Sequence, residues 1–279
     1  MNAAETTTTD TVTPGSAPVL DVRGLSVASG DGTRLVRDVS FQVAPGERLG
    51  LIGESGSGKS LTSFVVTGLL PSGLVATGSA VLDGVEVIGA RERDLVDLRG
   101  RVASVVFQEP LTALDPLMRL GKQVAEPLRR HLGLRGAALR EAVLQALAEV
   151  RLPDPERIAR AYPHEISGGQ RQRVAIAAAL ACRPRLLIAD EPTTALDVTV
   201  QAEVLALLDS LVVERGMALV FVSHDLAVVS KMTDRAIVLR DGRVVERGTM
   251  AQLLSVPSDP YTVELVRSAR ELDAALEVS

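Results

Sequence analysis

Short apolar runs, separated by residues that favour turns, recur along the whole chain. The runs LGLIG, RLLIAD and ALVFVS are apolar without alternation, which is typical of strands buried on both faces of a parallel sheet. Asp83-Gly84 and Asp241-Gly242 each divide an apolar run and favour the tight turns of antiparallel hairpins. The pattern predicts strands or hairpins over 19–27, 36–44, 47–53, 78–87, 102–107, 185–190, 218–223 and 236–247.

Helical periodicity is clear between 137 and 150, where Leu139, Val143 and Leu147 recur at helical spacing. The sequence also predicts a helical, charged tail after residue 255. These elements together predict a mixed α/β core with a mostly helical stretch, about 110–170, inserted between two strands. The other predicted helices span 59–70, 168–182, 199–214 and 225–232.

Composition narrows the class of protein. The 279 residues are 46% apolar but only 2% aromatic, so the core must consist mainly of Val, Leu, Ile and Ala. A net charge of −5 does not favour a nucleic-acid partner, and none is expected. No apolar stretch reaches the roughly 18–20 residues that a membrane span needs. The Thr-rich start lacks a basic region and an apolar core, so we expect residues 1–17 to form a disordered tail.

Cys182 is the single cysteine of the sequence. One cysteine excludes a disulfide or a multi-cysteine metal site within these 279 residues, and this usage suits a reducing cytoplasm. We expect Cys182 to be a small core residue on a helix.

The segment GESGSGKS, residues 53–60 and here called the phosphate loop, carries the first chemical signal. It follows the apolar run LGLI and opens onto LTSFVVTGLL, which is the strand–loop–helix context of a nucleotide-binding loop rather than of an ordinary Gly/Ser turn. Lys59 would bind the β- and γ-phosphates, and Ser60 would bind Mg²⁺. The remaining residues would wrap the phosphates with backbone N–H groups: Gly53, Glu54, Ser55, Gly56, Ser57 and Gly58.

Two adjacent carboxylates end the predicted strand RLLIAD. At the C-terminal edge of a buried strand, Asp190 would hold Mg²⁺ and Glu191 would polarise an attacking water. The alternative is a charged exit from a strand, and the phosphate loop upstream favours the catalytic interpretation.

A second glycine-rich helix start appears in EISGGQRQRVAIAAAL, residues 165–180. Helix N-termini attract anions, yet this stretch contains no lysine. Its alternative interpretation is a flexible Gly-Gly turn before a packed helix.

Together these segments resemble the ATP-binding subunit of an ABC transporter, over roughly residues 19–262. The resemblance implies a P-loop NTPase core with a mixed sheet, an antiparallel β subdomain and an inserted helical subdomain. It places the ATPase domain at 18–255 and a C-terminal extension at 256–279. The motifs, in the order of that family, are GESGSGKS (53–60), VFQEP (106–110), ISGGQ (166–170), LLIADEP (186–192) with TALD (194–197), and VSHD (222–225).

The resemblance also implies roles for single residues. Gln108 would lie in the hinge to the helical subdomain and reach towards Mg²⁺ and the water; it is otherwise a solvated loop amide. His224 would contact the γ-phosphate; it is otherwise a structural residue beside a helix N-cap. Asp197 would lie at the interface of an ATPase dimer.

The same resemblance implies a ligand for the ISGGQ motif. Ser167, Gly168, Gly169 and Gln170 would face the ATP that a second subunit holds, which explains why no lysine is needed. Hydrolysis would then require two ATPase subunits, either identical or paralogous.

A finer resemblance points to the importers of dipeptides, oligopeptides and nickel, on segments 107–126, 161–180 and 188–208. DPYT at 259–262 is similar to the HPYT of that branch, with Asp259 in place of His. The implied protein hydrolyses ATP with Mg²⁺ at the cytoplasmic face of a membrane. It would lie peripherally beneath two permease subunits, served indirectly by an extracellular solute-binding protein. The alternatives are a soluble ABC ATPase without a membrane partner and the ATPase of an exporter.

Three departures from the family pattern accompany this resemblance. Ser29 occupies the position where an aromatic residue stacks on adenine, so either the stack is missing or the aligned position differs. Ile166 replaces the usual Leu. The sequence ends at Ser279, soon after DPYT, and without a second cysteine it cannot hold the iron–sulfur cluster of some longer subunits.

Overall fold

The computed structural model describes residues 17–107, 114–194 and 196–277, with side chains described up to residue 271. The predicted tail therefore lies, except for Ala17, outside the described residues. Within the described part of the chain, no helix is long and apolar enough to cross a membrane.

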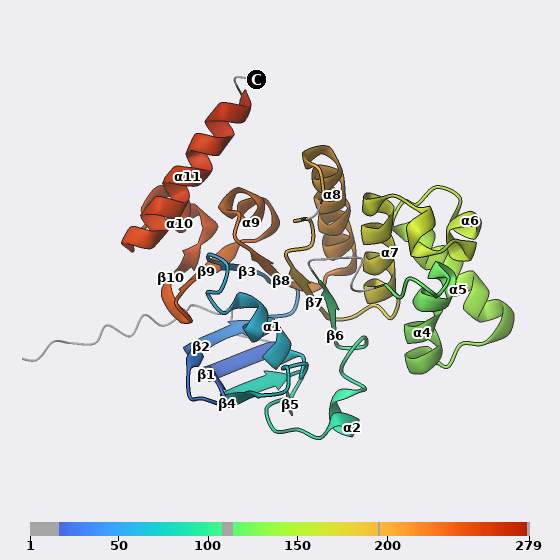
Figure 1. The fold of residues 1–279 in the computed structure, drawn as a ribbon, viewed down its shortest axis with the longest axis horizontal. Helices are drawn as coiled ribbons and strands as arrows, with labels where there is room; N and C mark the ends of the chain where they lie inside the picture. The colour runs from blue at the N-terminus through green and yellow to red at the C-terminus, as the bar shows by residue number, and fades with distance from the viewer. Residues whose placement is uncertain (1–16, 108–113, 195, 278–279) are drawn as a thin grey trace, which may run out of the picture.

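A six-stranded mixed sheet forms the centre of the molecule (Figure 1). Its order is β10-β9-β3-β8-β7-β6, with neighbouring strands parallel except at the β9–β10 hairpin. The prediction of a parallel core from LGLIG, RLLIAD and ALVFVS is confirmed. These strands are β3 Arg48–Ile52, β6 Ala103–Val106, β7 Leu186–Asp190, β8 Ala218–Ser223, β9 Arg235–Arg240 and β10 Arg243–Thr249.

A second sheet, of four antiparallel strands, packs with α1 against one face of the central sheet (Figure 1). Its order is β2-β1-β4-β5, and Asp83-Gly84 forms the β4–β5 turn that the sequence predicts. The strand β4 begins four residues before the predicted range. The bounds are β1 Leu20–Ser29, β2 Arg34–Val43, β4 Leu74–Leu82 and β5 Val85–Glu86.

Helices cover the other face of the central sheet. Along β7, Leu186 and Ile188 pack towards the antiparallel sheet, whereas Leu187 and Ala189 pack towards the helices, because side chains alternate along a strand. Helices α4–α7 lie between β6 and β7 in the chain, but the bounds of about 110–170 for a subdomain stay a prediction. The helices are α1 Lys59–Val66, α2 Glu92–Leu95, α4 Leu120–Leu132, α5 Gly136–Glu149, α6 Pro155–Arg160, α7 Gly168–Leu180, α8 Val198–Arg215, α9 Leu226–Met232, α10 Met250–Ser255 and α11 Pro260–Glu277, with a 3₁₀ turn at Pro163–Glu165.

Two helix ends differ from the predictions. The helix α1 ends at Val66, before the predicted residue 70, because Gly68 adopts a left-handed conformation that ends the helix. The helix α7 ends at Leu180, so Cys182 lies beyond it and is only half-buried. The expectation of a core cysteine on a helix is therefore wrong.

Candidate functional site

The phosphate loop connects the carboxyl end of β3 to the first turn of α1. Gly53 adopts φ 155°, and a Cβ on it would lie 2.2 Å from the carbonyl oxygen of Leu239. Only glycine permits this close approach of the loop to β9. The loop therefore wraps tightly at the edge where the parallel strands end.

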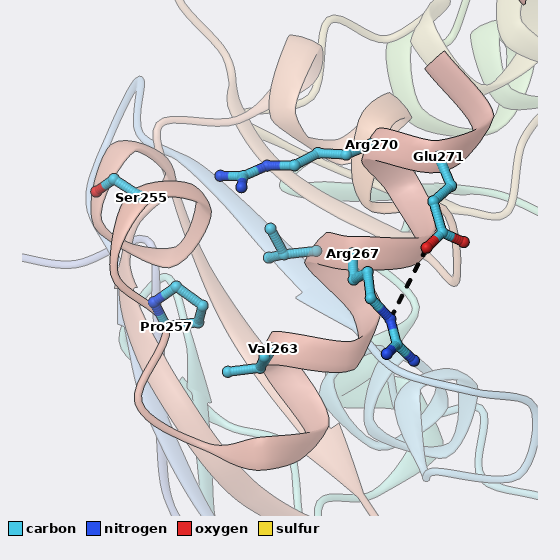
Figure 2. Close-up of a pocket in the computed structure, with 7 residues that line it drawn as sticks. Ser255, Pro257, Val263, Arg267, Arg270 and Glu271 are labelled. Carbon is cyan, nitrogen blue, oxygen red and sulfur yellow. Dashed lines mark ion pairs between the residues drawn. The ribbon is translucent and has the colours of Figure 1, made fainter. Parts of the chain in front are cut away.

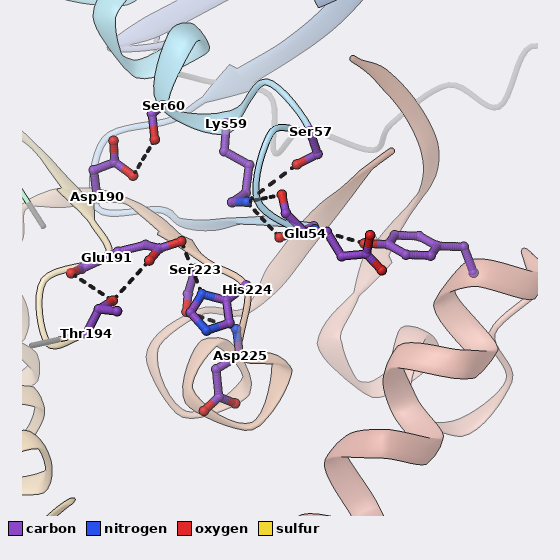
Figure 3. A network of polar contacts seen from close by, with 12 residues as sticks. Glu54, Ser57, Lys59, Ser60, Asp190, Glu191, Thr194, Ser223, His224 and Asp225 are labelled. Carbon is purple, nitrogen blue, oxygen red and sulfur yellow. Dashed lines mark hydrogen bonds and ion pairs between the residues drawn. The ribbon is translucent and has the colours of Figure 1, made fainter. Parts of the chain in front are cut away.

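The Lys59 ammonium is enclosed by this loop (Figure 3). Its Nζ donates to the carbonyl oxygens of Gly53 and Glu54 at 2.6 and 2.8 Å, and to Ser57 Oγ at 3.4 Å. Lys59 is 5% exposed. Burial lowers the pKa of Lys59, while the charges of nearby carboxylates raise it. A buried cation held by neutral oxygens is well placed to bind an anionic phosphate.

Asp190, at the end of β7, meets the first turn of α1. Ser60 Oγ donates to Asp190 Oδ1 at 3.2 Å, and burial raises the pKa of Asp190. A hydroxyl and a carboxylate are the hard oxygen ligands that Mg²⁺ prefers, usually together with phosphate oxygens. Among the described residues no cluster of three or more His, Cys, Asp or Glu is placed to hold a metal. The hydroxyl of Ser60 and the carboxylate of Asp190 are of the ligand types that Mg²⁺ binds.

Glu191 points to the same edge from a left-handed backbone conformation, φ 46°, which is uncommon for residues other than glycine. Its Oε1 lies 3.1 Å from His224 Nδ1, and its Oε2 accepts a hydrogen bond from Thr194 Oγ1 at 3.0 Å. The Glu191 backbone N–H donates to the carbonyl of Val222 at 2.9 Å. The carboxylate is thus held from two sides (Figure 3).

His224 begins the turn into α9. The next residue, Asp225, caps this helix by accepting from Ala227 and Val228 N–H groups at 2.9 and 3.1 Å. His224 is therefore the neighbour of a helix N-cap, and its ring also faces Glu191.

The ISGGQ motif forms the start of α7. Ser167 Oγ accepts from the Gln170 N–H at 3.3 Å, and Gln170 Oε1 accepts from the Ser167 N–H at 3.1 Å, which makes a capping box. Gly168 and Gly169 are the first residues of the helix, where backbone N–H groups lack partners within the helix. The helix start therefore retains the capacity to bind an anion.

The start of α8 lies beside that of α7. A Cβ on Gly169 would come within 2.5 Å of Val200 Cγ1, and Asp197 Oδ1 caps α8 by accepting from the Val200 N–H at 3.0 Å. In the described part of the chain, no hydrogen bond joins the ISGGQ motif to Lys59 or Asp190.

Two further positions, those of Gln108 and Ser29, belong to the site predicted from the sequence. Gln108 lies outside the described residues. Ser29 is the last residue of β1, and its hydroxyl donates to Asp31.

Sequence reasoning missed two polar partners of the site. Thr194 holds Glu191, and Tyr261 accepts a hydrogen bond from the Glu54 N–H at 2.9 Å although 207 residues separate the two. No sequence pattern near either residue predicts a contact between residues so far apart in the chain. A cavity of about 360 Å³ between α10 and α11, by contrast, contains none of the predicted site residues (Figure 2).

A parallel sheet with a glycine-rich phosphate loop, a buried lysine and two carboxylates at its carboxyl edge defines a P-loop nucleoside triphosphatase. The profile described as "ABC transporter" matches residues 36–194, more than half of the chain. The chain therefore belongs to the ABC transporter family, as an ATP-binding and ATP-hydrolysing subunit.

Relatives and solved structures agree with this assignment. The chain is 47% identical to a peptidoglycan transport ATP-binding protein of Agrobacterium fabrum, over 89% of this chain but 46% of that protein. It is 44% identical to the oligopeptide transport ATP-binding protein OppD of Salmonella typhimurium, over 95% of this chain and 81% of that protein. A dimeric ATP-binding cassette in a post-hydrolysis state with ADP and Pi has 30% identity and a TM-score of 0.71, covering 83% of this chain and 98% of that structure.

Proposed function

We propose that this chain hydrolyses ATP between two cassettes to power the import of peptides or a related solute such as nickel. The observation that carries the proposal is the gathering of Lys59, Ser60, Asp190, Glu191 and His224 at one edge of the central sheet. The peptide substrate is supported by the naming of relatives such as OppD.

The phosphate loop supplies the binding of ATP. Its backbone N–H groups and the Lys59 ammonium bind phosphate oxygens. Ser60, Asp190 and Gln108 would hold Mg²⁺, which would neutralise charge on the phosphates.

Glu191 acts as the general base. Its carboxylate polarises the attacking water, and His224 and Thr194 orient that carboxylate through the contacts at 3.1 and 3.0 Å. His224 is 55% exposed along its side chain, so its ring is accessible to a γ-phosphate at the edge of the sheet. Proton transfer to a positioned carboxylate typically contributes about 10²–10⁴-fold to a rate.

The ISGGQ motif serves the ATP of the partner cassette. The Ser167 hydroxyl, the Gly168 and Gly169 N–H groups and the positive end of α7 bind its γ-phosphate, with Gln170 holding Ser167. Asp197 lies at the same interface. The partner cassette is either a second copy or a paralogue.

The remaining partners are two permease subunits and, indirectly, an extracellular solute-binding protein. We place the chain peripherally, at the cytoplasmic face of the membrane.

Replacing Glu191 by Gln tests the proposal. The Glu191→Gln variant should bind ATP, accumulate as a closed dimer and lose at least about 100-fold in kcat, because the amide is not a base. The control is Glu214→Gln, which alters an exposed carboxylate on α8 and should hydrolyse normally. Normal turnover by Glu191→Gln would remove Glu191 from the catalytic role.

Transport is tested with the same pair of variants. In cells of the source organism that lack the gene, uptake of a labelled tripeptide should return with the wild type and Glu214→Gln, but not with Glu191→Gln. Unchanged tripeptide uptake in the gene-deleted cells would contradict peptide import. The assignment of the chain as an ATPase would still stand.

A further inference from the structure

The C-terminal helix α11 sends one aromatic side chain to the phosphate loop. Tyr261, on the first turn of α11, is 3% exposed, and its hydroxyl oxygen accepts a hydrogen bond from the Glu54 N–H at 2.9 Å. The Arg240 guanidinium lies over the same ring, 4.9 Å from its centroid. Burial raises the pKa of Tyr261, so the phenol stays neutral at physiological pH.

The hydrogen bond fixes one particular peptide group. The Glu54 N–H and the Gly53 carbonyl belong to the same peptide unit, which is planar and carries these two groups on opposite sides. Tyr261 binds its N–H, and the Lys59 ammonium binds its carbonyl at 2.6 Å. Because glycine permits many backbone conformations, the Gly53–Glu54 peptide would otherwise rotate easily. Tyr261 therefore sets the direction of a carbonyl that holds Lys59.

The start of α11 is itself anchored to the central sheet. The Glu246 carboxylate of β10 accepts hydrogen bonds from the Ser258 and Asp259 N–H groups at 2.7 and 3.1 Å, and Asp259 Oδ1 accepts from the Tyr261 N–H at 2.9 Å. The Tyr261 phenol therefore contacts the phosphate loop from a helix start that is held in place by hydrogen bonds to β10.

We infer that Tyr261 is a positioning residue for nucleotide binding: it holds the Gly53–Glu54 peptide so that the phosphate loop and Lys59 are ready for phosphate. The inference rests on the proposed binding of ATP by this loop. The Tyr261–Glu54 contact also couples α11 to the nucleotide. Because coupling is reciprocal, a contact that strengthens nucleotide binding is itself stabilised when the nucleotide binds.

The test compares Tyr261→Phe with Tyr162→Phe, which removes the only other phenol of the chain, in the helical stretch. Both variants keep the aromatic ring. Isothermal titration of the isolated protein with Mg²⁺ and ADP, which is not hydrolysed, should show about tenfold weaker binding for Tyr261→Phe, since a lost hydrogen bond leaves a partly buried N–H unpaired. Tyr162→Phe should bind as the wild type does.

Two further readouts separate positioning from mere support of the fold. The KM for ATP should rise about tenfold in Tyr261→Phe while kcat stays within about twofold. Hydrogen exchange at the Glu54 amide should become faster in the nucleotide-free variant, with a melting temperature close to that of Tyr162→Phe.

The outcomes are distinct. Wild-type ADP affinity in Tyr261→Phe together with faster exchange at Glu54 would overturn the inference and leave the proposed function intact. Failure of the wild-type protein to bind ADP would overturn both. A fall in melting temperature with unchanged affinity would assign Tyr261 to the fold alone and refute the positioning role.

Discussion

Buried charge distinguishes the site at the scale of single residues. Lys59 and Asp190 are each 5% exposed, and burial shifts both pKa values against the charged forms, downward for Lys59 and upward for Asp190. Charges withdrawn from water destabilise a protein unless a partner compensates them. Sites built for ligands often carry this cost, and under the proposed function the compensating partners would be a phosphate and a divalent cation.

Replacing Asp190 by Asn should therefore stabilise the nucleotide-free protein while it stops hydrolysis. At pH 8 we expect a melting temperature higher by roughly 2–4 °C, the shift that about 1 kcal/mol gives in a domain of this size. The folded pKa of Asp190 is raised, so the wild type regains stability as pH falls through that pKa. The advantage of Asp190→Asn should accordingly shrink towards acid pH.

The control for this experiment is Asp97→Asn, which alters an exposed carboxylate and should leave both the melting temperature and the hydrolysis rate unchanged. A lower melting temperature for Asp190→Asn at pH 8 would show that the bond to Ser60 outweighs the cost of burial.

At the scale of elements, strand ends and helix starts supply the chemistry. The strands β3, β7 and β8 end at one edge of the sheet, and Glu191 and His224 leave from neighbouring strands. The starts of α7 and α8 are capped by Ser167 and Asp197. The start of α11 is tied to β10 by Glu246, an attachment that no sequence motif indicated.

The Glu246 carboxylate makes the docking of α11 dependent on pH. Burial opposes ionisation, but hydrogen bonds from the residues that begin α11 lower the pKa of Glu246 below its ordinary 4.5. The stabilisation is therefore present above about pH 4.5 and is lost as pH falls through the lowered pKa. We expect Glu246→Gln to lower stability by about 1 kcal/mol at pH 7, and the difference to vanish in acid.

Denaturant unfolding across pH measures this effect, with Glu264→Gln on the exposed side of α11 as the control. A difference between Glu246→Gln and the wild type that stays constant from pH 7 to pH 3 would mean that the charge of Glu246 does not hold the helix.

At the scale of the whole molecule, the proposed function treats the phosphate loop and the ISGGQ motif as two half-sites rather than as one complete site. The phosphate loop joins β3 to α1, whereas the ISGGQ motif begins α7 beside the start of α8. No hydrogen bond between the described residues links the motif to Lys59. A symmetric pair of chains would place each motif against the loop of the other.

Mixing two inactive variants tests this arrangement. Lys59→Ala lacks a working phosphate loop, and Ser167→Arg blocks the ISGGQ motif without altering the loop. In a mixed dimer one site combines both defects, and the other combines an intact loop with an intact motif. We expect the mixture to recover clear ATPase activity, although each variant alone is inactive and Ser167→Arg still binds ATP. Crosslinking should show that mixed dimers form. If they form and the mixture still has no ATPase activity, hydrolysis across the interface is contradicted.

Much of the site was predictable because its signals are local. The phosphate loop is eight consecutive residues between a strand and a helix, and Asp190 and Glu191 end an apolar run. Strand positions followed from apolar runs and Asp-Gly turns. Helix ends were less predictable: α1 stops before Gly68, and Cys182 falls outside α7, because single-residue conformations decide where a helix terminates.

The sequence by itself determined the parallel core, the phosphate loop and the paired carboxylates, because each is encoded by neighbouring residues at fixed spacing. Tertiary structure alone decided which distant side chains contact each other directly. Ser60 contacts Asp190 across 130 residues, Glu191 contacts His224 across 33, and Tyr261 contacts Glu54 across 207. Such contacts depend on how the sheet and helices pack. Packing between distant elements produces no periodic pattern in the sequence from which these contacts could be predicted. Tyr261 was therefore only part of a motif in the sequence, and the fold gave it a partner in the phosphate loop.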